Sequence, residues 1–233
     1  MPHPQASGVM PPGEKETSHH VRSLPTRPLL RPPLRLLRLL FHHGRPRQAY
    51  LLALQAELHA RLGELPPGPL HTIYWGGGTP SQLPLEGISD VFDVIRNERG
   101  WLPEAEITLE ANPDDVSQQW AEALSRLPVN RVSLGVQTFS DDLLRLIGRR
   151  HTARQAIEAV HTLYGAGIRN LSIDLMYGLP GQTLEDFDRD ILTALSLPVS
   201  HLSAYALSYE PGTRLTRLLE LGQLQPTDEE TSR

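Results

Sequence analysis

The fold is decided by the stretch HTIYWGGGTPS at residues 71–81. Its first half, His71–Trp75, is rich in β-branched and aromatic residues and predicts a short strand. Its second half holds three consecutive glycines, which let a ligand approach the backbone closely and expose consecutive N–H groups. The alternative use of such a triplet is a tight turn that needs positive φ. The stretch therefore predicts a strand that ends in a ligand loop or a turn.

On both sides of this stretch the chain alternates between strand and helix patterns. Further β-rich runs lie at Glu106–Glu110, Arg131–Gln137, Asn170–Met176 and His201–Leu207. Helical patterns lie at Gln48–Leu62, Leu85–Asn97, Val116–Arg126, Asp141–Ile147, Ala153–Tyr164 and Leu184–Leu195. This alternation predicts an α/β fold of parallel strands joined by right-handed crossovers, either as an open sheet or as a barrel.

Composition narrows the class of protein. The chain has 233 residues, 39% of them hydrophobic, which suits one domain or part of a larger α/β barrel. No run of 18 apolar residues predicts a membrane span and no export signal is recognisable, so the cytoplasm is the expected compartment. The chain contains no cysteine, which excludes disulfides, thiolate metal sites and thiol catalysis.

The first 47 residues differ from the rest. They carry eight Lys and Arg against two acidic residues, nine of the 21 prolines and five of the ten histidines. We therefore expect residues 1–47 to form an irregular basic segment and residues 48–233 to form the core domain. The segment lacks the interleaved aromatics of a nucleic-acid platform, so no nucleic-acid partner is expected. The pairs His19-His20 and His42-His43 have no neighbouring carboxylate and are poor metal-ligand candidates.

Polar residues stand where successive β-runs end. A carboxylate at Glu110, an amide at Gln137 and a second carboxylate at Asp174 follow one another along the chain. Each alone is more often a cap or a turn former, but parallel strands bring their carboxyl ends to one rim. Beside the glycine stretch, these groups suit a ligand that carries hydroxyls and an ammonium group.

Several of these motifs resemble a known family. They are Tyr74–Ser81, Glu110–Asp115, Gly135–Phe139, Leu146–Thr152 and Ile173–Thr183. In order and spacing they are similar to the motifs of radical S-adenosylmethionine proteins of two kinds, the heme chaperones and the oxygen-independent coproporphyrinogen III oxidases. The stretch His201–Thr213 resembles the heme-chaperone branch more closely. The resemblance covers about 185 residues.

The resemblance implies a partial (β/α)6 barrel that binds S-adenosylmethionine. By matching motifs, the cofactor-binding residues are Gly77, Gly78, Thr79, Glu110, Gln137, Arg149 and Asp174. Ser208 falls at a further cofactor-lining position. A surface ion pair at a helix end is the alternative role for Arg149. His151, His161 and His201 are expected to be structural rather than heme ligands.

The family also implies a 4Fe-4S cluster held by three cysteines, and this chain has none. Thiolates are the ligands that hold such clusters. The pairs Leu30-Arg31, Leu34-Arg35 and Leu37-Arg38 have the spacing of C-x3-C-x2-C, and Leu-Arg codons can read as cysteine in the next frame. We therefore expect the first strand and cluster loop to be lost through an out-of-frame reading, or else the chain to be a cluster-free relative with a natural basic arm. No metal-ligating residue is assigned.

The function implied by the resemblance is heme binding and transfer to apo-hemoproteins, with heme or porphyrin as the partner. The alternatives are oxidative decarboxylation of coproporphyrinogen III and an inactive remnant. The family continues beyond its barrel into a smaller C-terminal region, so the barrel is expected to be incomplete at both ends. Enzymatic activity stays open at this stage, because the cluster that would start radical chemistry lacks its ligands.

Overall fold

The computed structural model of the chain describes residues 45–64 and 67–224. The strands are β1 (Leu70–Trp75), β2 (Trp101–Ala111), β3 (Arg131–Gln137), β4 (Asn170–Tyr177) and β5 (His201–Ala206). The α-helices are α2 (Arg45–Arg61), α3 (Leu85–Glu98), α4 (Gln118–Leu124), α5 (Asp141–Leu146), α6 (Ala153–Gly165), α7 (Leu184–Leu195) and α8 (Arg214–Glu220). Short 3-10 turns lie at η1 (Leu62–Glu64), η2 (Pro80–Gln82) and η3 (Pro113–Asp115).

Almost all of the predicted basic segment, including the Leu-Arg pairs and the position of the expected lost strand and cluster loop, lies outside the described residues. The same holds for residues 225–233 at the other end of the predicted core domain. The division into residues 1–47 and 48–233 therefore stays a prediction.

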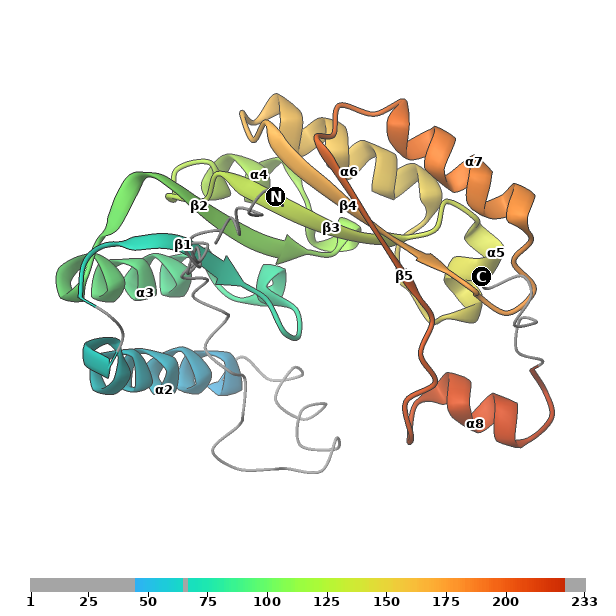
Figure 1. Cartoon of the computed structure of the whole chain (residues 1–233), viewed down its shortest axis with the longest axis horizontal. Coiled ribbons are helices and arrows are strands. Elements are labelled where there is room, and N and C mark those ends of the chain that lie inside the picture. The colour runs from blue at the N-terminus through green and yellow to red at the C-terminus, as the bar shows by residue number, and fades with distance from the viewer. Residues whose placement is uncertain (1–44, 65–66, 225–233) are drawn as a thin grey trace, which may run out of the picture.

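The five strands form one parallel sheet in the order β1-β2-β3-β4-β5. Every neighbouring pair is parallel, so each connection is a crossover that carries helices. Figure 1 shows the twisted sheet with α2 and α3 beside β1 and β2, and with α6 and α7 beside β4 and β5. This arrangement confirms the predicted α/β class and its partial-barrel architecture.

Three differences between the predicted elements and the structure have a clear structural basis. Strand β2 begins at Trp101 instead of Glu106, because Leu70 pairs with Trp101 before a register shift brings Thr72 opposite Glu106. Helix α4 is shorter than predicted, since the side chain of Ser117 caps it by accepting a hydrogen bond from the backbone N–H of Trp120. Helix α8, capped by the Thr213 side chain, was not predicted.

The core lies between the sheet and the helices that cover one of its faces. Strand residues such as Leu109, Leu134 and Ile173 are buried in a single apolar cluster with helix residues such as Phe92 and Val160. Burial on this scale stabilises the fold by about 1.5–3 kcal/mol for each large side chain. Helix α2 joins the same cluster through leucines including Leu51 and Leu58.

Helix α2 approaches α3 closely at a glycine. A Cβ atom at Gly87 would collide with the Leu51 side chain, so the contact depends on the missing side chain at that position. The helix predicted at Gln48–Leu62 corresponds to α2 and the first residue of η1, and Leu51, Leu58 and Leu62 are buried. Within the described residues, each helix is too short or too polar to cross a membrane.

Candidate functional site

The sheet has one apolar face and one polar face. Side chains alternate between the two faces of a strand, so residues of one parity share a face. The face opposite the helices, here called the inner face, carries Tyr74, Thr108, Glu110, Arg131, Ser133, Ser172, Asp174, Ser203 and Tyr205. The strand pairing places Glu110 beside Ser133, and Gly135 beside Asp174. A polar inner face cannot serve as the filled apolar core of a barrel, so it suits a polar ligand.

The glycine stretch packs against the end of β2. The backbone N–H of Gly77 donates to Oε2 of Glu110 at 3.2 Å. A Cβ atom at Gly76 would lie 2.8 Å from Oε1 of the same carboxylate, so only glycine allows this approach. Gly77 and Gly78 have φ values of 79° and 107°, which glycine adopts without strain. Thr79 precedes η2, and its side chain makes no capping hydrogen bond.

Glu110 is held from two sides. Besides the Gly77 N–H, it accepts a hydrogen bond at Oε1 from the Tyr74 hydroxyl at 2.7 Å. Burial raises the pKa of Tyr74, and the bond to Glu110 raises it further. Tyr74 therefore stays a donor across the physiological range, and the carboxylate is fixed beside the exposed glycines.

Asp174 is the second carboxylate of the inner face. The Ser133 hydroxyl donates to its Oδ1 at 3.0 Å. Burial is the main cause of its raised pKa; the Ser133 bond lowers the pKa and the charge of Glu110 raises it. Two carboxylates that influence each other across this face favour a cation between them. An ammonium or sulfonium group would satisfy both.

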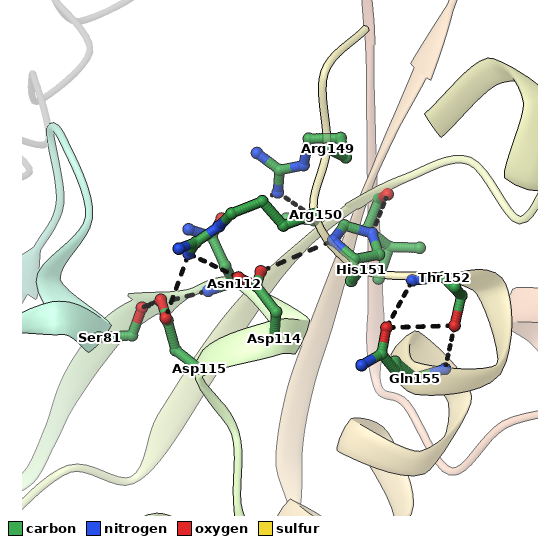
Figure 2. A network of polar contacts seen from close by, with 11 residues as sticks. Ser81, Asn112, Asp114, Asp115, Arg149, Arg150, His151, Thr152 and Gln155 are labelled. Atoms are coloured by element: carbon green, nitrogen blue, oxygen red, sulfur yellow. Dashed lines mark hydrogen bonds and ion pairs between the residues drawn. The ribbon is translucent and has the colours of Figure 1, made fainter. Parts of the chain in front are cut away.

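Arg149 lies at the rim, beside the end of β3. One of its terminal nitrogens donates to Oδ1 of Asn112 at 2.8 Å and also to the carbonyl of Gly135 (Figure 2). Burial lowers the pKa of this guanidinium. Because these two bonds use a single nitrogen, the rest of the fork can still receive a carboxylate. The alternative of a surface ion pair does not describe this half-buried side chain.

Gln137 ends β3 in an unusual conformation. Its φ is 72°, the one positive value at a non-glycine residue in the described part of the chain. The strand register shifts there, from Gly135 opposite Asp174 to Gln137 opposite Leu175. Its Oε1 accepts a hydrogen bond from the Tyr205 hydroxyl at 2.5 Å. Backbone strain of this kind is often found at functional sites.

A polar network that sequence reasoning missed supports the rim. The Ser81 hydroxyl donates to Asp115 at 2.6 Å and accepts from the backbone N–H of Asn112 at 3.3 Å. Arg150 bridges Asp114 and Asp115 at 2.5 and 3.4 Å (Figure 2). The network ties the glycine stretch to η3 and to the segment that carries Arg149. The only signal in the sequence was that these residues lie inside the quoted motifs.

The three histidines lie in different surroundings. His151 is buried, with 3% of its surface exposed, and its Nε2 lies 3.1 Å from the Val136 carbonyl. Its Nδ1 lies 3.9 Å from Asp114, and burial is the main cause of its lowered pKa. His161 and His201 are exposed on α6 and β5. Ser208 is exposed too, and its hydroxyl bonds to Glu210 at 2.7 Å.

The structure thus brings most of the predicted site residues together. Gly77 contacts Glu110 directly, and Gln137 and Arg149 both lie against Gly135, within 3.0 Å of where its Cβ would be. Asp174 pairs with that same Gly135 across the strands. Gly78 and Thr79 continue the loop after Gly77, whereas the Ser208 hydroxyl bonds to Glu210, outside this set.

Comparisons with known proteins identify the superfamily to which this chain belongs. The sequence profile of the Radical SAM superfamily matches residues 41–194, and the chain belongs to that superfamily. Within it, the chain is similar to the heme chaperone HemW of Bacillus subtilis (strain 168), at 40% identity over 187 residues, which cover 79% of this chain and 49% of that protein. It is also similar to HemW of Escherichia coli (strain K12), at 42% identity over 61% of this chain and 38% of that protein.

Solved structures agree with the fold. The coproporphyrinogen III oxidase HemN of Escherichia coli, a radical SAM enzyme, superposes with a TM-score of 0.71 at 25% identity, over 82% of this chain and 44% of that chain. The archaeal Elp3 of Methanocaldococcus infernus superposes with a TM-score of 0.61 at 20% identity, which supports the fold alone. The chain spans about half the length of the curated relatives it matches.

Radical SAM proteins in general use S-adenosylmethionine and a 4Fe-4S cluster. The residues of this chain are suited to the first of these cofactors but not to the second. The glycines, the paired carboxylates and the free side of Arg149 match a nucleoside with an amino-acid tail. The cluster does not fit, because the sequence contains no cysteine thiolate. Among the described residues, no group of three or more His, Asp or Glu could hold a metal ion either.

Proposed function

We propose that this chain is the S-adenosylmethionine-binding core of a heme chaperone of the radical SAM superfamily. The observation that carries the proposal is the polar inner face, which carries Glu110 beside the glycine stretch and Asp174 opposite Gly135. The similarity to HemW proteins at 35–42% identity supports heme as the cargo. Apo-hemoproteins are then the acceptors.

Each residue of the proposed cofactor site has a separate task. Gly77 and Gly78 leave room for the methionine moiety, with Thr79 beside them. Glu110 and Asp174 accept hydrogen bonds from amine and ribose groups, and Gln137 can donate to a ribose oxygen. The unused side of the Arg149 fork receives the cofactor's carboxylate.

Coproporphyrinogen oxidation is the second candidate, favoured by the likeness to HemN. It requires electron transfer through a cluster, and the chain offers no thiolates for one. We therefore assign no radical step to these residues. Heme binding and transfer need no such step, which is why the chaperone function comes first.

The test is S-adenosylmethionine binding by calorimetry, using the full chain and two variants. Asp174→Asn removes a charged acceptor of the inner face and should weaken binding about tenfold or more. The matched control is Asp188→Asn, which changes an exposed aspartate of α7 and should bind as the wild type does. Equal affinity of the wild type and Asp174→Asn would contradict the proposed site.

A hemin titration of the same protein tests the cargo. The proposal expects one hemin per chain with a defined Soret band, and transfer of that hemin to an apo-hemoprotein. Nucleoside binding without stoichiometric hemin binding would remove the chaperone function and leave a cofactor-binding remnant. Failure to bind either compound would remove the whole proposal.

A further inference from the structure

Tyr205 of β5 contacts Gln137 of the proposed cofactor site, although sequence reasoning gave it no role. We propose that Tyr205 is a positioning residue that holds the Gln137 amide with its NH2 group turned toward the cofactor. The inference rests on the proposed function, because it names how one side chain of that site is oriented. It adds a residue of β5, a strand from which no residue was assigned to the cofactor site.

The Tyr205 hydroxyl has a single well-defined partner. It donates to Oε1 of Gln137 at 2.5 Å, across 68 positions of sequence. In the sheet, Tyr205 pairs with Met176 of β4 and so stands on the inner face, next to Asp174. Burial is the main cause of its raised pKa, and the charges of Asp174, Arg149 and Glu110 all influence it. The phenol therefore remains protonated at neutral pH and keeps the proton that it donates to the Gln137 oxygen.

Gln137 is almost completely buried, so its side-chain amide has little freedom to change its orientation. It is 7% exposed, and its backbone has a φ of 72°. Its side chain lies over the β3 backbone, since a Cβ atom at Gly135 would come within 3.0 Å of Nε2. A larger residue at position 135 would push the amide out of place.

The bond from Tyr205 occupies the oxygen end of the Gln137 amide. An amide has an acceptor end and a donor end, and the hydrogen-bond network determines which faces a ligand. Here the acceptor end is taken, and the hydrogen bonds among the described residues leave Nε2 without a protein acceptor. Gln137 therefore presents two N–H donors, which fits a hydroxyl or carboxylate oxygen of the cofactor. A flipped amide would present an oxygen to the same group.

Calorimetry with S-adenosylmethionine on the full chain tests the inference. Tyr205→Phe keeps the ring and removes the hydroxyl, and its dissociation constant should rise about five- to tenfold. The matched control is Tyr164→Phe on the outer helix α6, whose affinity should equal that of the wild type. Gln137→Glu still accepts from Tyr205 but cannot donate, so it should bind weakly, and adding Tyr205→Phe to it should have no further effect.

A second readout follows the amide itself. In the wild type, the Gln137 side-chain NH2 protons should show NMR contacts to Gly135, and Tyr205→Phe should lose them while the rest of the spectrum persists. Wild-type affinity in Tyr205→Phe, or unchanged Gln137 contacts, would overturn the inference and leave the cofactor site standing. If the wild type binds no S-adenosylmethionine at all, the proposed function fails, and with it the role of Tyr205 toward the cofactor.

Discussion

The two faces of the central strands are made of alternate residues of the same chain segments, and their chemistry is opposite. On the outer face, Leu109, Leu134 and Ile173 are completely buried in the apolar cluster. On the inner face, their sequence neighbours are Glu110, Ser133 and Asp174. One step along the backbone moves from the part of the sheet that stabilises the fold to the part that we propose binds the cofactor.

The inner face is poorly suited to stabilising the protein. Ser172 is buried, and its hydroxyl has no hydrogen-bond partner within the described residues. Asp174 has a raised pKa because burial disfavours its charged form. Buried polar groups of this kind reduce stability unless a partner satisfies them. The difference between the faces supports the proposal that the inner face binds a ligand, since packing alone would favour apolar side chains there.

The largest difference in stability should separate two variants at adjacent residues that lie on opposite faces of the sheet. Ile173→Ala leaves a cavity in the outer cluster and should lower the free energy of unfolding by about 2–5 kcal/mol. Ser172→Ala removes a hydroxyl that has no partner, so its effect should stay within about 1 kcal/mol and can be stabilising. Urea unfolding followed by circular dichroism measures both variants. Equal losses at residues 172 and 173 would show that the faces do not differ as described.

Much of this division could be read from the sequence. The β-rich runs and the helical patterns between them gave the parallel α/β fold, and helix α7 begins and ends at the predicted Leu184 and Leu195. The sequence also predicted that Glu110 and Asp174 lie near each other, because parallel strands bring their carboxyl ends together, and the strand pairing places both on the inner face.

Contacts between distant segments could not be read in the same way. Ser81 meets Asp115, and Tyr205 meets Gln137, only because the twist of the sheet brings separate strand ends together. The early start of β2 at Trp101 depends on a register shift against β1, which no local pattern encodes. Local sequence propensity predicts helices and strands, whereas contacts between residues far apart in the sequence depend on the tertiary arrangement.

A smaller effect on the free energy of unfolding is expected from a substitution of the buried His151. Its Nε2 must donate to the Val136 carbonyl, so Nδ1 is unprotonated in the neutral ring. The folded-state pKa is lowered, so the unfolded chain binds more protons and stability falls as the pH drops through the unfolded value near 6.5. His151→Gln keeps a donor for Val136 and should be less stable than the wild type by about 1 kcal/mol at pH 7.5.

The difference between His151→Gln and the wild type should shrink from pH 7.5 to pH 5, because only the wild type loses stability by charging this side chain. Thermal unfolding at several pH values measures it. His161→Gln, a change at an exposed position of α6, serves as the control and should follow the wild-type curve. A constant difference across this range would mean that His151 does not titrate differently in the folded and unfolded states.

The smallest effect on stability should come from substituting an exposed apolar residue that lies on neither face of the sheet. Leu192 on α7 is 66% exposed, and Leu192→Ser should change the free energy of unfolding by no more than about 0.5 kcal/mol. The nearby Ala194 on the same helix is fully buried, and Ala194→Ser would place a hydroxyl in the apolar cluster, with a larger loss. If Leu192→Ser instead destabilised the protein as much as Ala194→Ser, α7 would have a partner on its exposed side, and the apolar face of the molecule would extend beyond the sheet.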